Sequence, residues 1–296
     1  MNILQRRDKK DLLFDIFNYS LMVFIIFIVI YPIWYVIIYS LNDGVDAMQG
    51  GIYWWPRVFT LENYKAVFTN TGIINAFYIT ILKTIIGTIV HVLFTGMVAY
   101  AFSRSELIGR KFYMIMGTIT LFFGGGLIPY FLLIRNLGLF DNFLVYIIPA
   151  MFNFFEAIIF ISFFRSIPNA LEEAAKIDGA SYFTIFFRII LPVSLPVVAT
   201  IALFHGVYQW NDYFTGVIFI NNPNLQPIQT YLYRIIAQSS ANQMLNLMPG
   251  SIATRTVTSQ SLKMATMVVT TLPIVFVYPF LQKYFVKGVM IGSIKG

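Results

Sequence analysis

The chain has 296 residues, of which 58% are hydrophobic and only 11% are charged, and its mean hydropathy is +0.74. Soluble domains carry about 25% charged residues, so this composition excludes an ordinary soluble protein and indicates a membrane protein. The absence of cysteine excludes disulfides and thiolate sites, and a total of two histidines argues against zinc or haem. The formal net charge is +7, and the basic residues behind it lie at the edges of apolar runs. This placement is typical of membrane topology and does not indicate a nucleic-acid partner.

Hydrophobic runs along the chain predict an all-α protein with six transmembrane helices. The first run, residues 16–41, follows a basic head like that of a signal peptide. It is long enough to span a bilayer and no small-residue cleavage site follows it, so we expect an anchor that stays. Lys83 and His91 interrupt the second run, and we interpret both as packing or snorkelling residues. The predicted spans cover residues 16–41, 73–102, 112–134, 143–164, 189–214 and 263–284.

Basic residues predict how these spans are oriented. If the N-terminus lies inside, thirteen Lys and Arg residues fall on the inner side and five on the outer side. Because inner loops of membrane proteins are enriched in these residues, both termini are predicted to be cytoplasmic. The predicted parts are a cytoplasmic N-terminus at 1–15, the first span at 16–41, a five-helix core at 73–284 with an inner loop at 166–190 and an outer loop at 215–262, and a cytoplasmic tail at 285–296.

The predicted inner loop is charged and helix-prone, although it lies between two apolar spans. Pro168 suits the first turn of a helix, and Glu172 and Glu173 lie near its start, where the helix dipole favours anions. Glu172 is four residues before Lys176 and can pair with it. Gly179 is placed to end the helix in a left-handed conformation.

Small and apolar residues give this loop a face for close contact. Ala174 and Ala175 lie near Leu171 on one side of the predicted helix, and the alanines would let another surface approach closely. A second short helix, over about 180–190, would present further apolar side chains, namely Tyr182, Phe183 and Phe186. A cytoplasmic loop of this kind predicts a docking element.

The stretch EAAKIDGA followed by IILPVSLP resembles the EAA loop of the membrane subunits, or permeases, of ABC importers. The residues that match the family pattern are Glu173, Ala174, Ala175, Gly179, Ile189, Leu191 and Pro192. The resemblance implies a coupling helix that fits a groove on a cytoplasmic ATPase, where the glutamate pairs with a basic residue. The residues that it assigns to this coupling are Leu171, Glu173, Ala174, Ala175, Asp178 and Gly179. The alternative is an ordinary cytoplasmic loop with fortuitous spacing, but the motif also lies at the predicted depth and topology.

Three longer stretches resemble sugar permeases of the maltose-permease type, and most of all their lipoprotein-like or polygalacturonan-type oligosaccharide subgroup. They are LFFGGGLIPYFLLIRNLGLFDNFLVYIIP (121–149), HGVYQWNDYFTGVIFINNPNLQPIQTYL (205–232) and YPFLQKYFVKGVMIGSIKG (278–296). The resemblance implies a type I ABC importer permease in a bacterial plasma membrane that takes up a sugar or oligosaccharide. It also implies the partners: a related second permease subunit, two ATPases that bind ATP and Mg, and an extracytoplasmic solute-binding protein, with membrane lipid around the spans.

Polar residues inside the spans are candidates for the translocation pathway. Glu156 is an acid in a predicted mid-span position, which is costly unless it faces a cavity or a partner, and Asn153 lies one turn before it. A second group on span five combines planar polar groups and an aromatic ring, a composition that suits sugar hydroxyls. Its members are His205, Gln209, Trp210, Asn211 and Asp212. The alternative is that these residues lie at a subunit interface or at the outer rim in water.

Several activities are not supported by any motif in the chain. No G-x-x-x-x-G-K-[ST], H-E-x-x-H or G-x-S-x-G pattern is present, so we expect a transport subunit that has no nucleotide site, cofactor, metal or catalysis of its own. An ion-driven secondary transporter is the alternative, and it would predict repeated halves and several intramembrane acids. An intramembrane enzyme could use only Glu156 and His205. The docking element argues against both alternatives, because neither requires one.

Overall fold

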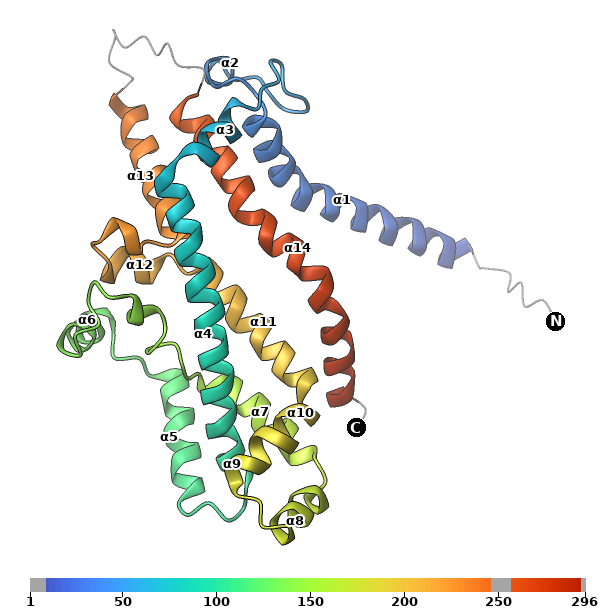
Figure 1. Ribbon diagram of the computed structural model, residues 1–296. Coiled ribbons are helices and arrows are strands. Elements are labelled where there is room, and N and C mark those ends of the chain that lie inside the picture. Colours follow the sequence, from blue (N-terminus) through green and yellow to red (C-terminus); the bar gives the residue numbers. More distant parts are fainter. Residues whose placement is uncertain (1–8, 246–256, 294–296) are drawn as a thin grey trace. The chain divides into compact units, whose positions relative to one another are not determined.

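The computed structural model describes residues 9–245 and 257–293, with side chains described for 12–237 and 257–276 (Figure 1). Apart from one isolated bridge between Asn42 and Phe59, all regular elements in these ranges are helices. The chain divides into two units, which we describe separately. Unit 1 comprises residues 1–69 and 235–269, and unit 2 comprises residues 70–234 and 270–296.

Two of the described helices are each long and apolar enough to cross a bilayer, namely α1 (Lys9–Ser40) and α4 (Thr71–Ser103). They cover the first predicted span as far as Ser40 and the whole of the second. Three further helix pairs meet the same test only if both bent members count as one span. These pairs are α5 (Arg110–Phe122) with α6 (Leu127–Asn136), α7 (Phe154–Ser166) with α8 (Asn169–Ile177), and residues 182–193 with α11 (Leu195–Asn211), bent by 118°, 76° and 86°. The sixth predicted span lies within α14 (Ser259–Ser293), and the count of six stays a prediction.

Unit 1 is built on the apolar helix α1 and the segment that follows it. This segment lies between the first two predicted spans and contains two short helices, α2 (Gly44–Met48) and α3 (Glu62–Thr69). The buried Asn63 holds the turn after α1, because its Nδ2 donates to the carbonyls of Ser40 and Asn42 at 2.9 Å each. A buried amide nitrogen that donates to two backbone carbonyls in this way fixes the backbone of the turn.

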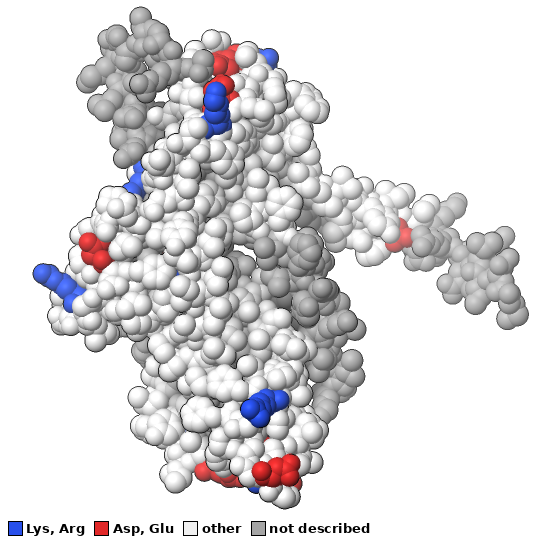
Figure 2. Space-filling view, viewed as in Figure 1, with Lys and Arg blue, Asp and Glu red and all other residues white. Residues whose placement is uncertain are grey.

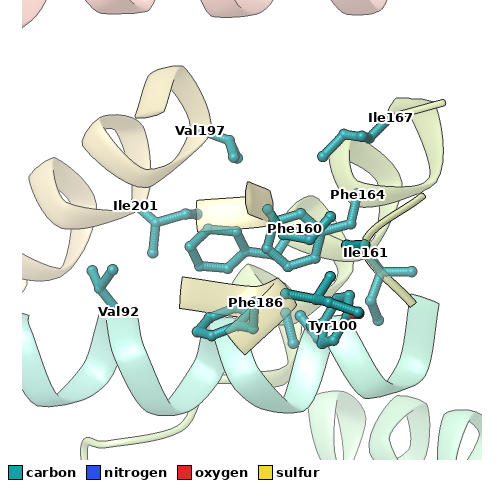
Figure 3. Close-up of a cluster of buried hydrophobic side chains, with 14 residues drawn as sticks. Val92, Tyr100, Phe160, Ile161, Phe164, Ile167, Phe186, Val197 and Ile201 are labelled. Carbon is teal, nitrogen blue, oxygen red and sulfur yellow. The ribbon is translucent and has the colours of Figure 1, made fainter. Parts of the chain in front are cut away.

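Unit 2 has its core where α4, α7 and α11 lie side by side (Figure 1). Phe160 and Phe164 are one turn apart on α7, and neither is exposed to any measurable extent. Figure 3 shows the core side chains pointing toward one another from different helices, including Val92 and Tyr100 of α4, Val197 and Ile201 of α11, and Phe186. Lipid tails are as apolar as these side chains, so close packing rather than the hydrophobic effect stabilises such a core in a bilayer.

The third predicted span, 112–134, is wrong as a continuous helix. The structure ends α5 at Phe122 and starts α6 at Leu127, and the two axes differ by 118°. The intervening residues include Gly124, Gly125 and Gly126, and each glycine costs a helix about 1 kcal/mol relative to alanine. Hydropathy alone does not register this cost, because the run stays apolar on both sides of the break.

The fourth and fifth predicted spans also differ at their ends. Span four was expected over 143–164, but α7 starts only at Phe154, after the 3₁₀ helix η1 (Phe143–Tyr146). Asn153 sets this start, because its side chain accepts hydrogen bonds from the Phe155 and Glu156 N–H groups. Span five, expected over 189–214, runs through the π-helix η2 (Phe186–Ile190) and the short α10 (Leu191–Val193), and after a break at Ser194 it continues as α11. Pro192 and Pro196 lack the N–H that a continuous helix needs here.

The segment predicted as an outer loop, 215–262, is largely helical where it is described. It contains α12 (Phe214–Phe219), the 3₁₀ helix η3 (Pro223–Leu225) and α13 (Ile228–Leu245), and α14 starts at its end. Residues 246–256 of this prediction lie outside the described residues. The tail predicted from residue 285 continues α14 as far as Ser293, and 294–296 lie outside the described residues.

Candidate functional site

The charged segment between α7 and α11 forms the helix α8, as its sequence predicts. Pro168 lies at its N-cap, and Glu172 Oε1 and Lys176 Nζ are 3.4 Å apart, so the predicted pair is confirmed. Gly179 follows the helix with a φ of 78°, which confirms the left-handed ending. The Gly179 and Ala180 N–H groups donate to the Lys176 and Ala175 carbonyls, and these bonds satisfy groups that a helix end would leave unpaired.

One face of α8 is exposed, and the other packs against the rest of unit 2. Of the six residues that the sequence assigns to coupling, five are exposed: Leu171, Glu173, Ala174, Asp178 and Gly179. The sixth, Ala175, is 9% exposed and belongs to the hydrophobic core, so it cannot contribute to an outer surface directly. Figure 2 shows charged side chains at the end of unit 2 that carries α8 and uncharged surface over most of the face above it.

The second short helix after α8 only partly follows the prediction. Helix α9 (Tyr182–Ile185) exposes Tyr182 and Phe183, as expected. Phe186 was expected on the same surface, but it is 1% exposed and its ring lies 5.6 Å from that of Tyr100. The reason is that the chain turns inward after Ile185 into the π-helical segment. A groove of about 500 Å³ remains between the exposed part of α9 and the end of α4.

A second set of polar residues connects α4 to α11 inside unit 2. Residues 83, 87 and 91 lie one turn apart on α4, and they face residues 212, 209 and 205 at the end of α11 in antiparallel order. We call these six residues the polar ladder: Lys83, Gly87, His91, His205, Gln209 and Asp212. His205, Gln209 and Asp212 were predicted as members of one polar group on span five, and the structure places all three against α4.

The first level of the polar ladder is a buried ion pair. Lys83 Nζ lies 3.2 Å from Asp212 Oδ2 and donates to the Asp212 carbonyl at 2.9 Å. The Lys83 side chain is fully buried, and that of Asp212 is 9% exposed. Lys83 was interpreted as a packing or snorkelling residue, and the snorkelling alternative is wrong, because its ammonium group points to Asp212 inside the protein. Asp212 does not lie at a water-exposed rim.

The second level is an amide that fits against a glycine. Gln209 is 1% exposed, and its Nε2 donates to the Tyr146 carbonyl at 2.9 Å. A β-carbon on Gly87 would lie 2.8 Å from that nitrogen, so any larger residue there requires the Gln209 side chain to shift. The close approach of α4 and α11 here depends on a small residue, which is common where membrane helices meet.

The third level consists of both histidines, and Glu156 of α7 contacts it. The rings of His91 and His205 are stacked, with centroids 3.7 Å apart and an angle of 8° between them. His91 Nδ1 donates to the Ala150 carbonyl at 2.8 Å, and Nε2 contacts the carboxylate of Glu156. Glu156 was expected in mid-span, but it lies in the first turn of α7. The prediction that an intramembrane acid needs a polar partner agrees with this contact.

The histidines and Glu156 are also the residues that could hold a metal ion. Their nitrogen and carboxylate atoms lie within 4.8 Å of one another, and first-row transition metals accept such donors. The two rings are nearly parallel, however, and nitrogen lone pairs lie in the ring planes. The lone pairs therefore do not converge on one point. The ring geometry therefore argues against a metal ion bound by both histidines.

The other predicted pathway residues lie apart from the polar ladder. Trp210 Nε1 donates to the Thr270 carbonyl at 3.1 Å, and Asn211 is exposed and donates to the Val207 carbonyl. Asn153 is exposed at the start of α7. A small pocket of about 60 Å³ does adjoin the ladder, lined by Tyr130, Tyr146, Tyr208, Gln209 and Asp212 among others. This pocket has room for a few water molecules or a hydroxyl group.

Sequence reasoning missed the α4 side of the polar ladder. Lys83, Gly87 and His91 recur every four residues, and this spacing places them on one helix face. The spacing was therefore visible in the sequence. It does not say which helix lies opposite, because contacts between helices are not encoded in local periodicity.

The fit between Gly87 and Gln209 predicts a specific cost. We expect Gly87→Ala to lower the free energy of unfolding by about 1–3 kcal/mol, because the new methyl group pushes Gln209 out of its hydrogen bond. Thermal unfolding of the purified protein in detergent measures this effect. The matched control is Gly206→Ala on α11, where a β-carbon would lie 3.5 Å from Thr88 Oγ1, an ordinary contact. Equal losses of thermal stability in both variants would contradict the assignment.

These features define the class of protein: a helical membrane protein that exposes the charged, amphipathic helix α8 between apolar segments. The chain belongs to the family of binding-protein-dependent transport system inner membrane components, whose pattern matches residues 4–291. It is therefore an inner-membrane protein.

Individual relatives agree with this assignment. The chain is 39% identical over 289 residues to the polygalacturonan/rhamnogalacturonan transport system permease protein YtcP of Bacillus subtilis (strain 168), covering 97% of this chain and 100% of the relative. It is 36% identical over 293 residues to protein LplC of the same organism, covering 97% of each. Its fold matches a chain from the crystal structure of a bacterial ABC transporter involved in the import of the acidic polysaccharide alginate. The TM-score is 0.84 at 29% identity, covering 94% of this chain and 98% of that one. The fold is that of a type I ABC importer permease.

Proposed function

We propose that this chain is the membrane-spanning subunit of an ATP-driven importer for a sugar or oligosaccharide. The observation that carries the proposal is α8, which presents an open face of Leu171, Glu173 and Ala174 from a chain that is otherwise mostly apolar. Such a face suits docking of a separate ATPase. The chain contains no phosphate-binding loop motif, so ATP and Mg would be bound by that partner.

The remaining partners follow from the family and from the architecture. The family is binding-protein-dependent, which supports an extracytoplasmic protein that delivers the solute. A single coupling segment makes this chain half of a pathway, so we propose a related second permease subunit and two ATPases. We also propose six spans with both termini in the cytoplasm, supported by the distribution of Lys and Arg.

The carbohydrate class is supported by the relatives, whose names concern polygalacturonan, rhamnogalacturonan and alginate. Within this chain, Gln209 and Asp212 line a pocket that admits a hydroxyl group but no larger part of a sugar. Glu156 and His205 each contact His91 inside unit 2. We therefore propose that most of the predicted pathway residues hold the helices of the pathway in place. Asn153 and Asn211 are exposed and free to contact solute.

The test is to purify the tagged chain from its native membrane in mild detergent and to identify what comes with it. We expect a second permease and an ATPase in stoichiometric amounts. Because the chain has no cysteine, a cysteine placed at Ala174 can cross-link the open face of α8 to its partner specifically. Recovery of the chain alone, with no ATPase even after cross-linking, would overturn the proposal.

A charge reversal on the open face gives a second check. Glu173→Lys should abolish uptake of solute by cells while the protein still inserts into the membrane, because the reversed charge would repel a basic partner on the ATPase. The matched control is Glu62→Lys, which reverses an exposed acid of the weak Glu62–Lys65 pair in α3. Normal uptake by the Glu173 variant would refute the docking role of this face.

A further inference from the structure

Two adjacent acids of α8 face opposite ways. Glu173 is exposed on the open face, whereas Glu172 is 4% exposed and points into unit 2. Its Oε2 lies 2.8 Å from Nη1 of Arg104, and the two side chains are 6% and 16% exposed. Arg104 directly follows Ser103, the last residue of α4, and forms its C-cap. This buried ion pair therefore joins the middle of α8 to the end of the helix that carries half of the polar ladder.

Further contacts surround this pair. Tyr182 donates a hydrogen bond to Glu106 Oε2 at 2.9 Å, and Lys176 Nζ lies 3.6 Å from Glu106 Oε1. Lys176 also lies over the ring of Tyr182, 4.9 Å from its centroid. The hydrogen bond from Tyr182, and then the charge of Lys176, lower the pKa of Glu106, so its carboxylate is ionised at neutral pH. Both α8 and α9 are thus attached to the residues that follow α4.

The covalent connections of α8 are less suited to carry a displacement. Before α8 the chain passes through Ile167 and Pro168 in extended conformations, and after it through the left-handed Gly179. Neither connection is helical, and the axes of α7 and α8 differ by 76°. A push on α8 can be absorbed by changes in these backbone angles. In contrast, the side-chain contacts join α8 to α4 directly, and the Arg104 guanidinium is itself held over the ring of Tyr100 at 4.7 Å.

We propose that Glu172 and Arg104 are positioning residues that fasten α8 to α4, so that a displacement of α8 by the ATPase moves α4 and, through the polar ladder, α11. This inference rests on the proposed function and deepens it. It assigns different roles to the two neighbouring acids: Glu173 receives the partner, and Glu172 transmits the motion. α4 and α11 then move as one body, because the ladder holds them together at three successive turns: by the Lys83–Asp212 ion pair, by the close approach of Gln209 to Gly87, and by the stacked histidine rings.

The test compares single charge reversals with the exchanged pair in the complete importer, reconstituted with its ATPases and binding protein in liposomes. We expect Glu172→Arg and Arg104→Glu each to reduce uptake by roughly tenfold or more, within the usual range of coupling between sites. ATPase co-purification should stay at the level of the unaltered protein. The exchanged double variant should recover most of the uptake. A parallel exchange of the exposed Glu62 and Lys65 should have no effect, and it controls for the number of charges altered.

A structural readout separates attachment from docking. Hydrogen exchange of the full chain in lipid nanodiscs should show faster exchange of the α8 amides in Glu172→Gln and no change in Glu173→Gln. Loss of ATPase co-purification in Glu172→Arg, or no recovery in the exchanged pair, would overturn the role of the pair in transmission. If the unaltered chain brings no ATPase while Glu172→Gln still loosens α8, the proposed function fails and the transmission role with it, although the attachment itself stands.

Discussion

Replacing Lys83 with methionine is expected to cost the protein about 3–5 kcal/mol of its free energy of unfolding, because it leaves the carboxylate of Asp212 buried without its partner. Asp212 would retain only the hydrogen bond from the Thr215 N–H and access to the small adjoining pocket. A loss of this size lowers the midpoint of thermal unfolding by on the order of 10 °C. Thermal unfolding of the purified protein in detergent, followed by size-exclusion chromatography, measures it.

Two comparisons make this result specific. Lys65→Met removes one partner of the exposed pair with Glu62, and exposed pairs contribute about 0–1 kcal/mol, so the midpoint should hardly move. The double variant Lys83→Met with Asp212→Leu removes both buried charges and should recover most of the loss. If Lys83→Met were no more harmful than Lys65→Met, the ion pair could not hold α4 to α11.

The size of this effect matters for transport as well as for folding. A residue that only lined the pathway could be neutralised with little loss of stability, because water would solvate the partner that remains. A residue that joins two helices cannot be neutralised without a large loss of stability. The buried positions of Lys83, Gln209 and His205 therefore favour a mechanical role for the polar ladder, in which it keeps two helices together while they move.

Local features of the site could be predicted from the sequence, because the residues that cause them lie close together in the chain. Helix α8 is set by Pro168 at one end and Gly179 at the other, and both signals act over a few residues. The stripe of His205, Gln209 and Asp212 follows from helical spacing alone. In each case the physical cause is contained in one segment of sequence.

Contacts between distant segments could not be predicted in the same way. The partners of Glu172 and Asp212 lie on α4, about 70 and 130 residues earlier in the chain, and nothing in the local pattern identifies them. The break after Phe122 could not be predicted for another reason. Hydropathy measures only how apolar a stretch is, and it does not show whether the helix bends within that stretch. The glycines at 124–126 lie inside an apolar run, and hydropathy does not count their cost to a helix.

The ending of α8 gives the second large prediction. Gly179 has a φ of 78°, and a β-carbon there would meet no atom within 4 Å, so any effect of substitution comes from the backbone alone. A left-handed conformation costs an ordinary residue about 1–2 kcal/mol, and a β-branched side chain is especially unsuited to it. We expect Gly179→Val to unwind the end of α8, to displace its open face, and to abolish uptake.

A graded series shows whether the backbone is the cause. Asparagine visits the left-handed region more readily than other non-glycine residues, so Gly179→Asn should retain much of the uptake that Gly179→Val loses. Both variants should insert into the membrane and unfold at nearly the same temperature as the unaltered protein, because the strain can be relieved locally within residues 177–181. Uptake measured in cells at matched membrane levels decides the matter. If asparagine were as harmful as valine, the requirement would be for the absence of a side chain at the docking surface, and the left-handed ending would not be what positions α8.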